Sequence, residues 1–112
     1  MGKKRIPDSV GQAALADPLQ RPMAVRYLLQ IIEDQHSGHS VELRVPPFGA
    51  IQCVAGLNHR RGTPPNVVEM SPETFLALCL GELDWEGARA SGKVIASGTL
   101  TKELGDVFPL IS

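Results

Sequence analysis

The sequence predicts a single α+β domain in which an antiparallel sheet of four to five strands carries helices on one face. Three segments with strand patterns, 40–45, 50–54 and 66–70, follow one another through connections too short for parallel crossovers. Helical patterns flank these strands, from about residue 18 to 35 and from 71 to 80, which is the order of an α+β fold. The 112 residues are enough for one hydrophobic core.

The N-terminal part of the chain divides into two regions. Residues 1–17 contain Pro7 and Gly11 and show no sustained hydrophobic period, so they are predicted to be irregular. The domain itself is predicted over residues 18–112, and its first helix can be capped by Asp17. Polar residues at helical spacing form one stripe on this helix and leave a wide apolar face: Arg26, Gln30, Glu33 and Asp34.

The first strand has the alternation of a sheet with one wet face. Val41, Leu43 and Val45 alternate with Glu42 and Arg44. A Pro-Pro-Phe-Gly turn follows and leads into the second strand.

The helix at 71–80 has clear start and stop signals. Ser71 is a good N-cap, Pro72 suits the first helical position, and Gly81 can end the helix. Its residues from Phe75 to Leu80 are all apolar, so it must be covered on more than one side. The second cover could be the C-terminal tail, a partner subunit or a bound apolar ligand.

The remaining elements are short. Asp84 can cap a helix over 85–90, and a strand is predicted over 93–97. A last helical turn is predicted near 102–104, and the apolar tail 107–111 is predicted to pack back on the domain.

Composition argues against several classes of protein. The net charge of -1 gives no case for nucleic-acid binding. No apolar run approaches the roughly 18 residues of a membrane span. The basic N-terminus lacks the apolar region of a signal peptide, which favours a cytoplasmic protein. Cys53 and Cys79 lie in apolar segments and are predicted to be buried free thiols, with a disulfide between them as the alternative.

Nothing in the residue pattern indicates catalysis. No nucleophile with a neighbouring base and orienting acid can be identified. The His and Cys residues lack metal-ligand spacing, and no glycine-rich phosphate loop is present. We therefore expect a protein that is not an enzyme and that needs no metal or cofactor.

The last third of the chain resembles the sterol carrier protein type 2 superfamily. The run SPETFLALCLGELDWEGARASGKVIASGTL combines a capped helix, a short helix and a Ser-Gly-Lys sequence before an apolar strand. The helix positions that carry the resemblance are Glu73, Phe75, Leu78, Gly81 and Leu83. The stretch RGTPPNVVE is similar to a short stand-alone bacterial branch of that superfamily.

This resemblance implies a sheet and helices around an apolar tunnel for a lipid, fatty acyl or sterol-like ligand. The residues predicted to line it are Ile51, Met70, Phe75, Leu78, Cys79, Leu83, Trp85, Val107 and Phe108. In a domain this small, the same side chains could simply form the hydrophobic core, which is the competing interpretation.

The loop over residues 58–65 is the candidate for a polar head group. His59, Arg61 and Thr63 could hold a carboxylate or phosphate above the apolar wall. The alternative is a structured turn whose arginines pair with acidic residues of the same chain.

Three functions fit the sequence. The first is a binding module for an apolar ligand. The second is a structural or protein-interaction domain, including a homodimer, that uses Pro46-Pro47-Phe48 and the Arg61 loop. The third is an accessory domain that works with a separate enzyme.

Overall fold

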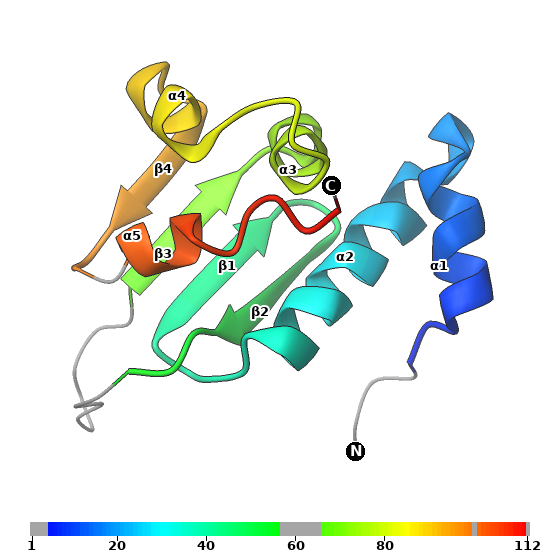
Figure 1. Ribbon diagram of the computed structural model, residues 1–112, viewed down its shortest axis with the longest axis horizontal. Coiled ribbons are helices and arrows are strands. Elements are labelled where there is room, and N and C mark those ends of the chain that lie inside the picture. The colour runs from blue at the N-terminus through cyan, green and yellow to red at the C-terminus, as the bar shows by residue number, and fades with distance from the viewer. Residues whose placement is uncertain (1–4, 57–65, 100, 112) are drawn as a thin grey trace.

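The fold is that of a computed structural model, which describes residues 5–56, 66–99 and 101–111 (Figure 1). The helices and strands follow one another along the chain with these bounds: α1 Asp8–Leu15, a 3-10 turn Pro18–Gln20, α2 Arg21–Gln35, β1 Val41–Val45, β2 Gly49–Cys53, β3 Asn66–Met70, α3 Pro72–Cys79, α4 Trp85–Ala90, β4 Val94–Ser97 and α5 Thr101–Gly105. The α+β class predicted from the sequence is confirmed.

The described residues form a four-stranded sheet in the order β2-β1-β3-β4. The outer ladders, β1 with β2 and β3 with β4, are antiparallel as predicted. The central ladder is parallel and pairs Val41 with Asn66 and Arg44 with Glu69, so the sheet is mixed, though mostly antiparallel. A parallel crossover is needed only between consecutive parallel strands. Here β2 lies between β1 and β3 in the sequence and runs antiparallel to β1. It brings the chain back to the end of the sheet where β3 begins, so short connections are compatible with the parallel pair.

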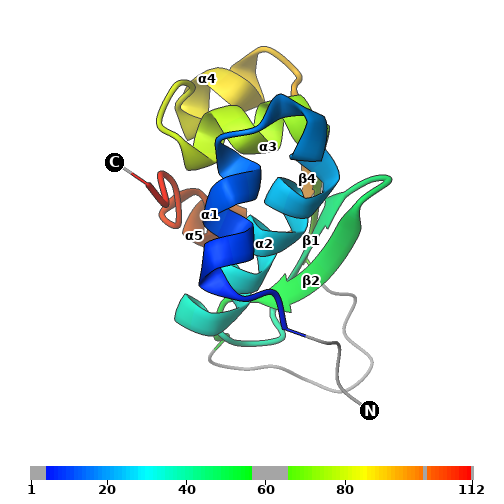
Figure 2. The same cartoon turned by 90° about the vertical axis from the view of Figure 1, so that its right-hand side faces the viewer.

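The helices cover one face of this sheet, as the sequence predicted. Figures 1 and 2 show α2, α3 and α5 on the same side of the strands. Strand residues that point to this side are buried, whereas Glu42, Arg44 and Ile95 lie on the other, uncovered side. The largest fully buried side chains come from both layers: Val25, Leu28, Ile32, Val41, Leu43, Val45, Cys53, Val68, Phe75, Leu78, Cys79 and Leu104.

The prediction that residues 1–17 are irregular is wrong over Asp8–Leu15, which form helix α1. This helix packs on α2, on the side away from the rest of the domain (Figure 1). Its N-cap is Pro7, which makes no side-chain capping bond, and its buried residues are the small Gly11 and Ala14. Neither a polar cap nor a stripe of large apolar residues therefore marked this helix in the sequence.

In the C-terminal third, the helix caps and the position of the tail agree with those predicted from the sequence. The Ser71 hydroxyl accepts a hydrogen bond from the Thr74 N–H at 3.1 Å, and Asp84 caps α4 in the same way through the Gly87 N–H at 2.7 Å. The apolar tail packs back on the domain as predicted, because the N–H groups of Leu110 and Ile111 both donate to the Cys79 carbonyl. The tail thereby supplies the second cover of α3.

Candidate functional site

The side chains predicted to line an apolar tunnel lie mostly in a closed core. Phe75, Leu78 and Cys79 have no exposed surface, so no space as wide as a water molecule adjoins them. Met70, Trp85 and Val107 are also buried, while Leu83 and Phe108 are half-buried against the same core.

Phe108 of the tail lies next to α3 and forms an aromatic cluster with Phe75 of α3 and Trp85 of α4. The Phe108 ring meets the Phe75 ring edge to face at 6.2 Å and stacks on the Trp85 ring at 6.0 Å. The Trp85 indole N–H is buried, and no hydrogen-bond partner for it exists within the described parts of the chain. These contacts are those of a packed interior, which agrees with the competing interpretation of the apolar wall.

The other predicted site residues have different positions. His59, Arg61 and Thr63 fall outside the described residues. Ile51 lies on β2, where its side chain reaches both the core and a cavity on the flank of the domain.

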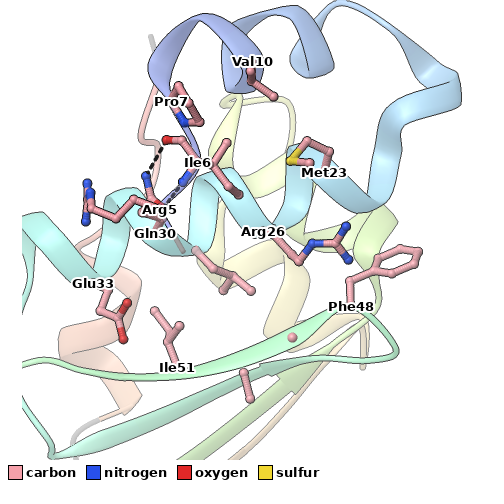
Figure 3. A pocket seen from close by; sticks show the side chains of 13 residues that line it. Arg5, Ile6, Pro7, Val10, Met23, Arg26, Gln30, Glu33, Phe48 and Ile51 are labelled. Carbon is pink, nitrogen blue, oxygen red and sulfur yellow. Dashed lines mark hydrogen bonds between the residues drawn. The ribbon is translucent and has the colours of Figure 1, made fainter. Parts of the chain in front are cut away.

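This lateral cavity, with a volume of about 630 Å³, lies between the N-terminal segment, α2 and β2 (Figure 3). Ile6, Pro7 and Val10 line it on one side and Phe48, Gly49, Ala50 and Ile51 on another. Helix α2 supplies the wall between them through Met23, Arg26, Leu29, Gln30 and Glu33. Three elements that are far apart in the sequence therefore build one cavity.

The N-terminal segment is fastened to α2 by its main chain. The Gln30 side-chain amide accepts from the Ile6 N–H and donates to the Ile6 carbonyl, both at 3.0 Å (Figure 3). The Arg5 guanidinium makes two hydrogen bonds to the Asp34 carboxylate, and this pairing lowers the pKa of Asp34. Residues Arg5–Pro7, here called the strap, thus close one side of the cavity.

Helix α1 is held by Tyr27 of α2. The Tyr27 hydroxyl donates to the Asp8 carboxylate at 3.0 Å and accepts from the Gln12 amide at 3.4 Å. Gly11 lies directly over the Tyr27 ring, so that a Cβ atom there would lie 2.2 Å from ring carbons.

We expect Gly11→Val to detach α1 from α2 without unfolding the sheet, because the added carbons overlap the Tyr27 ring. Hydrogen exchange would then show loss of protection in α1 and retained protection in β1 and β3. Ala13→Val is the matched control, since Ala13 lies on the same helix and is exposed. Equal exchange in the two variants would contradict the close contact.

Some charged side chains at the cavity form ion pairs and others do not. Arg5 is engaged with Asp34, and Gln30 is engaged with the strap. Arg26 and Glu33 are exposed, and neither forms an ion pair with another described residue. Arg26 extends toward Phe48 across the cavity (Figure 3), so a cation is available beside apolar surface.

Sequence reasoning identified the polar stripe of α2 but not its role. Arg26, Gln30 and Glu33 recur at the helical period, which is typical of a solvent-facing stripe. In the structure these three residues line the cavity, because the strap and α1 lie across this side of α2. The role of this stripe could not be predicted, because no signal in the sequence marked the strap and α1 as the elements that lie across it.

Both cysteines are free and buried, as predicted. Burial, together with the Glu33 carboxylate, raises the pKa of the Cys53 thiol to about 11, and burial also raises the pKa of the Cys79 thiol. A thiol in the unfolded chain ionises near its ordinary value of 9.0, so the unfolded state releases protons first as the pH rises.

We therefore expect the free energy of unfolding to be unaffected by these thiols below pH 9 and to fall between pH 9 and about 11. Urea denaturation across this range would measure the fall. Cys53→Ala should flatten the slope relative to the parent protein, and an unchanged slope would contradict the assignment to this thiol.

No helix within the described residues is long and apolar enough to cross a membrane. Within the same residues, no group of three or more His, Cys, Asp and Glu side chains is arranged to hold a metal ion.

The one-sided helical layer, the mixed sheet and the lateral cavity define a small α+β domain with a cavity on its flank. The chain belongs to the family described as "Bacterial SCP ortholog", whose profile matches residues 18–110. The resemblance to a short bacterial branch of the sterol carrier protein superfamily is thereby confirmed. No curated protein matches the sequence. The matched range begins after the strap and α1, so one wall of the cavity lies outside it.

Proposed function

We propose that this protein is a binding module for an apolar or amphipathic small molecule, a lipid or acyl compound, held in the lateral cavity. The observation that carries the proposal is the cavity itself, with a volume of about 630 Å³ and apolar side chains from three elements. Ligand sites commonly have volumes of roughly 300–1,000 Å³ and a mostly apolar lining. Membership of the sterol carrier family supports the same class of ligand.

The two ends of such a ligand would have different surroundings. A hydrocarbon chain would contact Val10, Met23 and Leu29, where its removal from water is favourable. A polar head would lie toward the open side, within reach of Arg26. The proposed role is binding without a chemical step, so the ligand would leave unchanged.

Titration with a dansyl-labelled undecanoic acid tests this proposal. The dansyl fluorescence should rise on addition of the parent protein and saturate at one ligand per chain. Val10→Trp should weaken binding by about tenfold, because the indole would occupy the space beside Val10, which lines the cavity.

Ile95→Trp is the matched control, because Ile95 is exposed on the uncovered side of the sheet. Native mass spectrometry of the purified protein, with organic extraction, would show whether a ligand is retained from the cell. Equal weakening in both Trp variants, or absence of saturable binding to the parent protein, would refute the proposed function.

A further inference from the structure

The hydrogen bonds of the β1–β2 ladder show which main-chain groups of β2 are free. Hydrogen-bonded and non-bonded pairs alternate in an antiparallel ladder. The ladder ends with Val45 opposite Gly49, and this is a hydrogen-bonded pair, because the bonds that flank a non-bonded pair would here need an N–H on Pro46. Ala50 and Gln52 of β2 therefore face outward, away from β1.

Ala50 and Gln52 are the outward-facing residues of β2, and Ala50 borders the lateral cavity. Their N–H and C=O groups point away from β1, because β2 is the edge strand of the sheet. Within the described part of the chain, no main-chain group pairs with them on that side. The edge contains no proline or lysine and is therefore chemically open to another strand.

A groove follows this edge. A second hollow of about 440 Å³ adjoins the lateral cavity, and Glu33, Ala50 and Ile51 border both. Together they extend from Phe48 to Gln52, along a strand of five residues that spans about 17 Å. Helix α2 runs beside the edge and forms the opposite wall (Figure 3).

We propose that the groove binds an extended polypeptide segment, which adds to the sheet as an antiparallel strand beside β2. The main chain of the segment would pair with Ala50 and Gln52, and an apolar side chain opposite Ile51 would enter the lateral cavity. This inference goes beyond the proposed function and does not rest on it, since a lipid would use the apolar wall and not the strand edge.

The charges on α2 give this segment a direction. Arg26 lies toward the Phe48 end of the groove and Glu33 toward the Gln52 end, seven positions apart or about 10 Å along the helix. Charge complementarity therefore favours an acidic residue at the Phe48 end and a basic residue at the Gln52 end. In an antiparallel strand the basic residue comes first in the sequence of the segment.

A second copy of the protein does not fit this groove. Two β2 edges would have to approach to about 4.8 Å to pair. The edge lies at the bottom of the groove, between α2 and the strap, and the same walls would project from both copies. An isolated extended segment meets no such obstruction, so the occupant is a peptide.

The test uses the full chain and the peptide acetyl-Lys-Thr-Leu-Thr-Asp-amide, in which Lys, Leu and Asp share one face and their N–H groups one edge. Peptide titration followed by nuclear magnetic resonance should shift the amides of Ala50 and Gln52 and leave those of β4 unchanged. A peptide with the first threonine N-methylated should bind about tenfold more weakly, because this residue lies opposite Gln52 and could no longer donate to the edge. A peptide with N-methyl-leucine is the matched control and should bind as the parent does.

The charge assignment is tested in the same titration. Arg26→Gln should weaken binding severalfold, whereas Arg21→Gln, on an exposed residue outside the groove, should not. The proposal is overturned if millimolar peptide shifts neither amide, or if the two N-methylated peptides bind equally. Binding of undecanoic acid is measured separately, so loss of either activity alone identifies which inference has failed.

Discussion

Phe75→Ala is expected to lower the free energy of unfolding by about 3–5 kcal/mol, because the ring is fully buried between the sheet and the tail. The loss combines the transfer of the ring to water with the void that remains. Urea denaturation at neutral pH would show it as a lower midpoint at an unchanged slope. A domain of this size has only about 5–15 kcal/mol of stability, so the variant should be close to unfolding at 37 °C.

Ile95→Ala provides the control for this measurement. Ile95 is 69% exposed, so its truncation should change the free energy of unfolding by no more than about 0.5 kcal/mol. A loss below about 1 kcal/mol for Phe75→Ala would mean that the interior beside α3 is not closed.

Phe108→Ala is expected to cost about 2–3 kcal/mol and to open the space that the tail now fills. The half-buried ring would lose its contacts with Phe75 and Trp85. Emission of Trp85, the single tryptophan, should shift to the red as water reaches the indole. Benzene should raise the stability of this variant and not that of the parent protein, because an apolar void binds small apolar molecules.

Phe108→Leu is the matched variant for this experiment. A leucine side chain would keep most of the apolar contact, so we expect a loss of about 1 kcal/mol and no response to benzene. An unchanged Trp85 emission in Phe108→Ala would show that the tail does not seal the aromatic cluster.

These two predictions bear on the family relationship. The sterol carrier resemblance implied an apolar tunnel between the sheet and the helices. In this chain the tail anchors itself on the Cys79 carbonyl and places Phe108 against α3. The lateral cavity lies instead on the flank of the domain, under the strap.

Local signals in the sequence were sufficient for most elements. Ser71 and Asp84 accept the capping bonds predicted for them, and α3 ends just before Gly81, whose φ of +76° requires a glycine-like backbone. The alternation in 40–45 identified β1 and its buried side. Caps, turns and periodicity depend on residues that are close together in the sequence, so they can be recognised without knowledge of the fold.

The cavity could not be predicted in this way because it depends on contacts between distant residues. Gln30 binds the main chain of Ile6, and no spacing rule connects the two. The packing of Gly11 on Tyr27 is similar, since only the folded chain brings the glycine over the ring. The parallel pairing of β1 with β3 likewise depends on which edge of the hairpin β3 joins.

That strand order also has a consequence for how the chain folds. The hairpin of β1 and β2 closes through a single turn, whereas contacts such as that of the Asn66 amide with the Ser40 carbonyl join residues 26 positions apart. Closing the longer loop costs more chain entropy before any contact compensates for it. We therefore expect the hairpin to form early and the parallel ladder to set the rate of folding. The hairpin would then be complete in the transition state, so destabilising β2 should slow folding at least as much as destabilising β3.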